Sequence, residues 1–487
     1  MSIKHIIKYL SIIFLGVFMG WLAGIDFKLP IIVLVGMGLI LTGISLPAAF
    51  LAVALLVTHS CLSFINEDWF RFAYVFRISD LFFLGAMFIC FVTILTIKEE
   101  DKPKILKRYT IIMAIIVLAT LLQIFITQMR FPETTLLSSL RMGRRYLYIM
   151  LFYPACIFLF KNKNMRVFVN IAAIFSTFVS IAFIIQFLSK GRIYLIPFSR
   201  SVFQNMLGIS AYRIYISGTE LINFTFFFIF FHYIFTLFNK QKAKILLILA
   251  MIFTALHPLL SLGRSRIIGF LLALFVTIFM ARNKKIRLRI ARYLLLSLGF
   301  FILVILLFGI ISPGEKGLPG FIKDRTLSSF DEVLTNTGTF RFRLDDSYYR
   351  IQLIKDNPLL GIGFLHDESQ ELSYMRGFNG QFRTADSGLI SLMIDFGLIG
   401  LIGFLVIFIF IFKDLLFLIR SMPKDTYEYA VIMSIFAVLL IYIVEFLTSG
   451  SFMSFGGFAV LGIFMGIVNN AIYRYQKSNV SSNQWHK

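Results

Sequence analysis

The chain has 487 residues, of which 59% are hydrophobic and only 15% are charged, and its mean hydropathy is +0.86. This composition excludes an ordinary soluble globular protein, because apolar runs of about 20 residues, long enough to cross a bilayer, recur from end to end. A net charge of +22 would indicate nucleic-acid binding in a soluble protein, but here the basic residues lie in the links between apolar runs. Membrane topology and anionic lipid explain that charge, so no nucleic acid is expected as a partner.

The sequence predicts an all-α polytopic membrane protein with about fourteen spans, in a range of about 12 to 14. Lys4 and Lys8 precede the first span, which we expect to be a retained helix rather than a cleaved signal peptide. Pro47 alone separates the second span from the third. The spans are expected near 9–25, 30–46, 47–65, 80–97, 109–127, 146–160, 167–188, 220–238, 245–260, 265–281, 293–312, 388–412, 428–447 and 453–472.

The basic residues predict the orientation. If both termini are cytoplasmic, the short inner links are rich in Lys, whereas the outer links are richer in Arg. Because long loops translocate largely regardless of charge, the basic residues of the short inner links predict a multi-pass protein of the cytoplasmic membrane with both termini in the cytoplasm. Arg presents a planar fork that binds phosphate through two hydrogen bonds, so an Arg-rich outer face suits a phosphate or diphosphate ligand. The alternative is that Arg snorkels well at the membrane interface.

Four regions follow from this reading: 1–200, N-terminal membrane helices; 201–312, membrane helices with outer-face arginines; 313–387, a large extracytoplasmic loop; and 388–487, C-terminal membrane helices. An amphipathic helix is expected in the loop, over 344–356. Its predicted apolar face carries Leu344, Tyr348, Ile351 and Ile354. Asn357-Pro358 should end this helix, and the Gly361-Ile362-Gly363 sequence after it is more typical of a plain turn than of a phosphate-binding loop.

Three arginines are candidates for binding a lipid diphosphate. Arg213 precedes the eighth expected span, and Arg264 and Arg266 lie at the outer end of the tenth. Arg264 and Arg266 could simply flank a span, and Arg213 could be a solvated loop arginine. A short turn there would also hold the guanidinium groups at the membrane surface, where the diphosphate of a lipid carrier lies.

Other polar side chains allow two readings each. Asp386 precedes an apolar helix, where it could be an N-cap or a general base. His366, beside Asp367 and Glu368, could bind a metal or act as a base, although a solvated loop cluster is the simpler reading. Glu445 is an intramembrane carboxylate and hence a functional candidate, unless it only pairs with an outer arginine. The three cysteines, Cys61, Cys90 and Cys156, lie in or beside apolar runs and are expected to be core residues.

Several of these motifs together resemble the O-antigen polymerase and O-antigen ligase superfamily. The resemblance lies in Arg343, in 349–363 with its Asn-Pro-Leu-Leu-Gly-Ile-Gly turn, in the Thr-Ala-Asp-Ser-Gly motif of 384–388 and in Gly-Leu-Ile-Gly at 397–400. The Arg-Ser-Arg motif of 264–266 and the loop arginine Arg213 are similar to further family motifs. The likeness covers about residues 205–410.

The resemblance implies glycosyl transfer on the outer face of the membrane, with a polyprenyl-diphosphate-linked oligosaccharide as the substrate. It implies a metal-independent glycosyltransferase without a cofactor, with Asp386 as base and with Arg213, Arg264 and Arg266 on the diphosphate. Arg343, Arg350, His366 and Glu445 are further candidates. Membrane lipids, a chain-length regulator and a flippase are the implied partners.

The ligases carry Ala-His-Asn where this chain has Ala385-Asp386-Ser387, which favours polymerisation of O-antigen, capsule or exopolysaccharide repeat units over ligation. An O-antigen ligase is therefore the first alternative. A polysaccharide flippase or other transporter is the second, although such proteins place charges in mid-span, whereas here most charges lie at span edges.

Overall fold

A computed structural model describes residues 42–59, 77–99, 102–132, 134–189, 199–204, 210–216, 218–237, 245–261, 264–280, 354–364, 387–448 and 453–484, with isolated residues between 193 and 352. The expected span at 9–25 lies outside these residues, as do residues 30–41 of the span expected at 30–46 and nearly all of 293–312. Asp386, Arg343, His366 and Cys61 also lie outside them.

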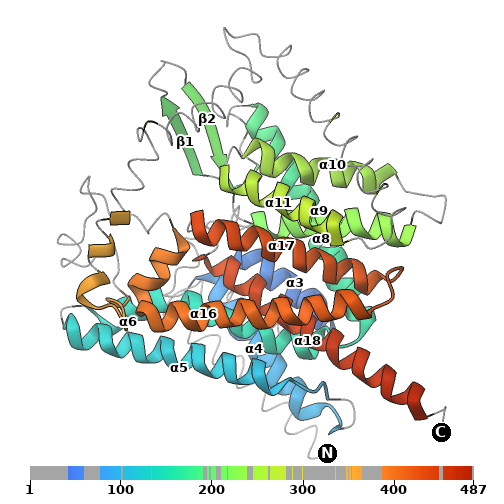
Figure 1. The fold of residues 1–487 in the computed structure, drawn as a ribbon, viewed down its shortest axis with the longest axis horizontal. Helices are drawn as coiled ribbons and strands as arrows, with labels where there is room; N and C mark the ends of the chain where they lie inside the picture. Colours follow the sequence, from blue (N-terminus) through green and yellow to red (C-terminus); the bar gives the residue numbers. More distant parts are fainter. Residues whose placement is uncertain are drawn as a thin grey trace, which may run out of the picture.

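The described residues form a bundle of helices with one small sheet (Figure 1). The first half contains α3 (Pro47–Thr58), α4 (Ile78–Thr96), α5 (Lys107–Arg130), α6 (Leu136–Leu147), the 3-10 helix η3 (Tyr148–Leu151), α7 (Phe152–Phe158) and α8 (Asn162–Leu188). After the strands β1 (Ser199–Gln204) and β2 (Ser210–Tyr215) come α9 (Thr219–His232), the π-helical turn η4 (Tyr233–Leu237), α10 (Ile245–Leu260) and α11 (Arg264–Met280). The chain closes with α16 (Gly388–Ser421), α17 (Tyr427–Thr448) and α18 (Phe455–Gln484).

Six of these helices are long and apolar enough to cross a membrane: α4, α5, α8, α16, α17 and α18. Four shorter apolar helices, α3, α9, α10 and α11, accompany them. All ten correspond to predicted spans, and α3 begins at Pro47, as the sequence indicated. A helical membrane protein is therefore confirmed, whereas the count of about fourteen spans and the large loop stay predictions.

The structure differs from the sequence analysis in two segments of the first half. The expected span 146–160 is instead divided among the end of α6, η3 and α7. Pro154 lies in the first turn of α7, where its missing amide costs no helical hydrogen bond. The segment around Arg213, read as a loop, is strand β2, which pairs with β1 in an antiparallel register that sets Arg213 opposite Ser201.

The predicted helix over 344–356 is helical at its described positions, and only part of its predicted apolar face is buried in the protein. Tyr348 and Ile351 are exposed, whereas Arg350 and Ile354 are buried. Ile354 packs on Ile390 in the first turn of α16, and a residue four positions earlier on a helix lies on the same face. Packing on α16 has therefore selected a face that its apolar spacing did not reveal.

Helices α17 and α18 lie at the centre of the bundle. In their most apolar stretches 78% and 94% of the residues are buried, against 33% in α4, α5 and α16. Helix α17 packs on α9, α11 and α16, and α18 packs on η3, α7 and α16. The outer helices expose apolar side chains such as Phe88, Leu118 and Ile409, as expected where lipid replaces water.

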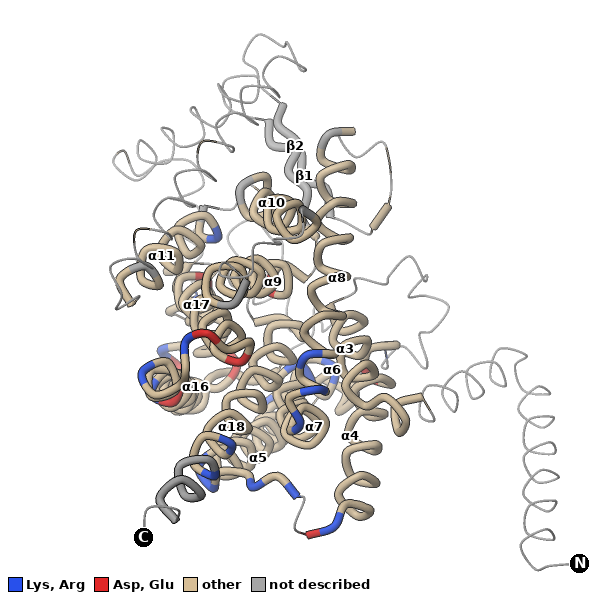
Figure 2. The backbone as a smooth tube through the Cα atoms, turned by 90° about the vertical axis from the view of Figure 1, so that its right-hand side faces the viewer, with Lys and Arg blue, Asp and Glu red and all other residues tan. Residues whose placement is uncertain are grey.

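The two ends of the bundle differ in charge. We call "loop end" the end where α3, α5, α10 and α17 finish and α4, α9, α11, α16 and α18 begin. Figure 2 looks along α16 and α17 and shows basic positions on α6 and α11, on α18 and in the link between α4 and α5. Among described residues, basic positions at the loop end are arginines apart from Lys355: Arg77, Arg130, Arg141, Arg144, Arg145, Arg200, Arg213, Arg264, Arg266 and Arg350. The described lysines of the links between helices lie at the opposite end.

Candidate functional site at the loop end

Arg266 and Glu445 form a buried ion pair at the loop end. Arg266 is in the first turn of α11, and its Nε donates to Glu445 Oε1 in the last turns of α17 at 3.2 Å. The Glu445 side chain is 2% exposed and that of Arg266 is 12% exposed. A carboxylate buried this deeply is costly unless it is paired, so the pairing explains why Glu445 can lie in an apolar helix. Of the two readings of Glu445 given by the sequence, the structure contains the one in which it pairs with an arginine of the loop end.

A second pair lies nearby. His59 follows α3, and its Nδ1 is 3.5 Å from Glu220 Oε2 in the first turn of α9; both side chains are buried. Arg266 is close enough to interact electrostatically with Glu220 and with His257 of α10. Five helices thus bring two carboxylates, one guanidinium and two imidazoles to one end of the bundle. Sequence reasoning selected only Arg266 and Glu445, because no local pattern distinguishes the other three from ordinary polar residues at helix ends.

The start of α16 joins the same region. Ser387, which follows Asp386 in the chain, donates its hydroxyl to the backbone oxygen of Leu447 at 3.3 Å, two residues beyond Glu445. Gly388 packs against Phe446 of α17. The beginning of α16 and the end of α17 are therefore side by side, which brings Ser387 and Gly388 of the Asp-Ser-Gly motif to the helix that carries Glu445.

Arg264 is the first residue of α11, one half-turn before Arg266, and β2 with Arg213 precedes α9, the helix of Glu220. Arg350 is buried on the face of its helix that meets the first turn of α16. The structure thus gathers the elements that carry most of the predicted residues at one end of the bundle. The side chains of Arg213 and Arg264, and all of Arg343, His366 and Asp386, are outside what the structure describes.

The turn at 357–363 is an anchor for α16. Helix α16 is broken at Gly397, whose φ of 66° and ψ of −160° suit glycine alone. The break frees the Ile394 oxygen and the amides of Leu398 and Ile399. The turn supplies their partners: Ile362 N donates to Ile394 O at 2.7 Å, and Leu398 N and Ile399 N donate to the oxygens of Pro358 and Leu359 at 2.8 and 3.2 Å.

The same turn is held from α5. Gln123 Nε2 donates to Leu360 O at 3.0 Å, Arg130 Nη1 donates to Gly361 O at 2.5 Å, and Phe364 N donates to Thr127 Oγ1 at 2.8 Å. The amides of Gly361, Ile362, Gly363 and Phe364 all donate within the protein. None of them remains for a phosphate oxygen, which agrees with the plain-turn reading of this glycine motif.

Two buried carboxylates at the loop end were missed by the sequence analysis. Asp80 of α4 accepts from Arg144 Nη1 at 2.5 Å and from Tyr148 OH at 2.7 Å. Asp395 of α16 accepts from the side chains of Arg145 and Tyr146. A lone aspartate inside an apolar run was the available signal, because it needs a partner in the bundle. The four partners lie on α6 and η3, where the sequence analysis expected a membrane span to begin at residue 146.

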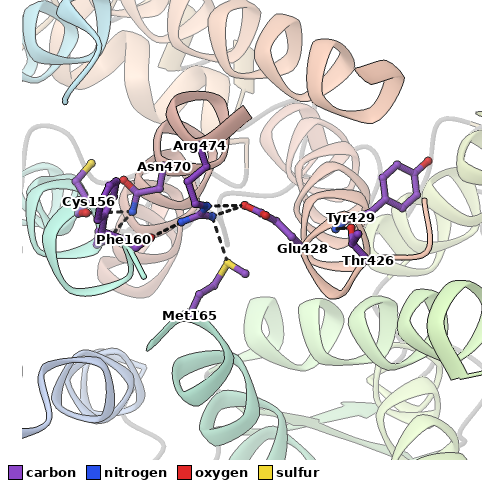
Figure 3. Close-up of polar contacts among 9 residues, drawn as sticks. Cys156, Phe160, Met165, Thr426, Glu428, Tyr429, Asn470 and Arg474 are labelled. Atoms are coloured by element: carbon purple, nitrogen blue, oxygen red, sulfur yellow. Dashed lines mark hydrogen bonds and ion pairs between the residues drawn. The ribbon is translucent and has the colours of Figure 1, made fainter. Parts of the chain in front are cut away.

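The opposite end is fastened by polar contacts (Figure 3). Arg474 of α18 binds Glu428 at the start of α17 and donates to the backbone oxygen of Phe160 at 2.5 Å. Asn470 donates to the oxygens of Ala155 and Cys156 at 3.2 and 3.0 Å. Local backbone and side-chain groups therefore use these donors, and this end serves to tie α17 and α18 to α7. Cys156 and Cys90 are buried and unpaired, as expected of core residues.

Residues 249–405 match the family model described as O-antigen ligase. This match supports the O-antigen ligase and polymerase superfamily for the chain. The matched residues run from α10 through the first half of α16, so they include Arg264, Arg266, the anchoring turn and Asp386, but neither Arg213 nor Glu445. No curated protein matches the chain. The superfamily consists of enzymes of the glycosyl-transfer type that act on lipid-linked oligosaccharides, and residues 249–405 are the part of this membrane protein that is similar to them.

Proposed function

We propose that the protein polymerises lipid-linked oligosaccharide repeat units on the outer face of the cytoplasmic membrane, by glycosyl transfer from polyprenyl diphosphate. The observation that carries the proposal is the convergence at the loop end of α11 with its Arg-Ser-Arg motif, the start of α16 and the end of α17. The loop end would face outward, since the short lysine-rich links between described helices lie at the opposite end, where the positive-inside rule places the cytoplasm.

The reaction needs few protein groups. A hydroxyl of one lipid-linked repeat unit attacks the anomeric carbon of a second glycan, the new C–O bond forms, and the bond from that carbon to the diphosphate oxygen breaks. The hydroxyl proton passes to a carboxylate, for which Asp386 is the candidate. The departing diphosphate gains negative charge, which nearby guanidinium groups stabilise.

The arginines would share this work unequally. Arg266 is already paired with Glu445, so the pair carries little net charge. Arg264 and Arg213 are therefore the better candidates for neutralising the diphosphate, while Arg266 offers hydrogen bonds from its remaining amino groups. The reason is that a carboxylate paired with a buried guanidinium neutralises much of its positive charge and so weakens its attraction for a second anion.

A ligase is the second candidate, favoured by the description of the matching family model. Polymerase and ligase share the donor and the leaving group, and they differ in the acceptor. The polymerase reading rests on Asp386-Ser387 standing where ligases carry His-Asn.

The test is the glycan length profile of a deletion strain complemented with wild type, with Asp386→Asn and with Asp356→Asn. Asp356 is an exposed carboxylate on the helix before the anchoring turn, so it controls for loss of an acid in this region. Polymerisation predicts single repeat units in the deletion strain and a ladder with wild type and Asp356→Asn, but none with Asp386→Asn. If the deletion strain instead accumulates long polymer on its lipid carrier, the ligase reading is supported. If the deletion strain fails to export the repeat unit, both readings are overturned.

A further inference from the structure

His257 lies in the last turn of α10, four residues before Ser261 and close to the candidate site. Its side chain is 1% exposed, and neither ring nitrogen has a hydrogen-bond partner among the described residues. The ring is held edge-on by Phe183 of α8, with 4.8 Å between ring centroids. Buried polar groups in native proteins almost always have partners, so a fixed imidazole without one requires an explanation.

Arg266, like His257, has a buried nitrogen atom without a hydrogen-bond partner among the described residues. Glu445 takes the Nε side of its guanidinium, while Nη1 is buried and has no hydrogen-bond partner in the described part of the chain. Arg266 also lies close enough to His257 for the two side chains to interact electrostatically. Donors on two consecutive helices, α10 and α11, are therefore buried near one another, and both are unsatisfied within the described residues.

The chemistry of the two donors restricts which group could bind them. Arg266 can only donate, and a neutral imidazole offers one N–H and one acceptor nitrogen. An oxygen-rich group accepts from both, and a phosphate oxygen or a sugar hydroxyl does so without adding a buried cation. The carboxylates of Glu220 and Glu445 already lie beside Arg266 and offset its positive charge, so the group that binds here need not be an anion.

We propose that His257 and Arg266 form a two-point donor site for an oxygen of the lipid-linked substrate, with Glu445 as the positioning residue that holds the guanidinium. The inference rests on the proposed function and adds His257 to its binding residues. It places this contact between the ends of α10 and α11, beside the Arg-Ser-Arg motif.

The proposal makes an unusual prediction for His257→Leu. If the imidazole has no partner but substrate, removing it takes away a buried unsatisfied group, so the thermal midpoint of the purified full-length protein in detergent should stay the same or rise. The KM for lipid-linked repeat unit extracted from the deletion strain should nevertheless rise about tenfold to a hundredfold, the loss expected for a hydrogen bond to a charged group. His257→Gln, which keeps a side-chain N–H donor, should recover part of that loss.

His232→Leu is the matched control. His232 ends α9 and also has a buried ring nitrogen, Nδ1, without a hydrogen-bond partner among described residues. It packs on Tyr427 at the start of α17, at the opposite end of the bundle. Its substitution should leave KM unchanged.

Two results would overturn the proposal. If His257→Leu lowers the thermal midpoint and leaves KM unchanged, the imidazole has a structural partner such as buried water. If His257→Leu and His232→Leu change KM equally, the effect is not local to this site. Failure of the proposed function is recognised separately, because wild-type protein would then form no polymer from the extracted substrate.

Discussion

Replacing Gly397 by alanine should separate the anchoring turn from α16. Alanine at φ 66° and ψ −160° is strained by about 1–3 kcal/mol. Its Cβ would also lie 2.4 Å from the carbonyl carbon and oxygen of Leu359 and 2.5 Å from the nitrogen of Gly361. These atoms are backbone and cannot rotate away, so the turn must shift.

The shift puts four hydrogen bonds at risk: Ile362 N and Gly363 N to Ile394 O, and the amides of Leu398 and Ile399 to the turn. At roughly 0.5–1.5 kcal/mol net each, their complete loss would cost about 2–6 kcal/mol. With the backbone strain added, the total reaches about 3–9 kcal/mol, a large part of the stability of a typical domain.

Gly403→Ala is the matched control, because Gly403 is on the same helix and no atom lies within 4 Å of an added Cβ. It should be neutral or stabilising by up to about 1 kcal/mol, since alanine favours a helix over glycine. The assay is thermal unfolding of both purified variants in detergent, together with the glycan ladder in the complemented deletion strain. Equal thermal midpoints and equal ladders for the two variants would refute the anchoring role of the turn.

Two further predictions concern the opposite end and the orientation. Asp414 accepts hydrogen bonds from Arg108 Nη2 at 2.6 Å and from the buried Tyr109 hydroxyl at 2.5 Å, so Asp414→Ala should lower the free energy of unfolding by about 1–3 kcal/mol in denaturant titrations. Lys413→Ala, at the exposed neighbouring position, should change it by no more than about 0.5 kcal/mol. An equal loss in both variants would contradict the stabilising role of the Asp414 contacts. In a cysteine-free background, a membrane-impermeant thiol reagent added to whole cells should label a cysteine at position 136, at the loop end, but not one at position 99 in the link between α4 and α5. The reverse pattern would put the loop end in the cytoplasm and exclude an outer-face reaction.

Part of the candidate site could be predicted from the sequence, because some of its signals are local. Arg266 stands at the edge of an apolar run, and Glu445 stands inside one, where a carboxylate needs a partner or a function. The sequence predicted that Glu445 is either a functional carboxylate or the partner of an arginine, and the structure contains the ion pair between Arg266 and Glu445. The roles of Asp386, Arg213 and Arg264 stay predictions.

The rest of the site depends on partners that sequence spacing does not reveal. Asp395 binds Arg145, 250 positions away, and Asp80 binds Arg144, 64 positions away. In the sequence, nothing distinguishes His257 from other residues of an apolar helix, and only the structure shows that Phe183 contacts its ring and that Arg266 lies nearby. The strand at Arg213 and the buried face of the helix with Arg350 were missed for a similar reason, since pairing and packing outweighed local preference.

The sequence by itself determined that the chain is a membrane-embedded helical bundle and where most of its described helices run, because a bilayer span is a local requirement on about 20 consecutive residues. It also determined the resemblance to a glycosyl-transfer superfamily, since those motifs are contiguous. Only the tertiary structure decided which charged side chains neutralise one another and which donors remain unsatisfied. A buried charge finds its partner through the packing of helices distant in the chain, and that packing depends on the whole bundle.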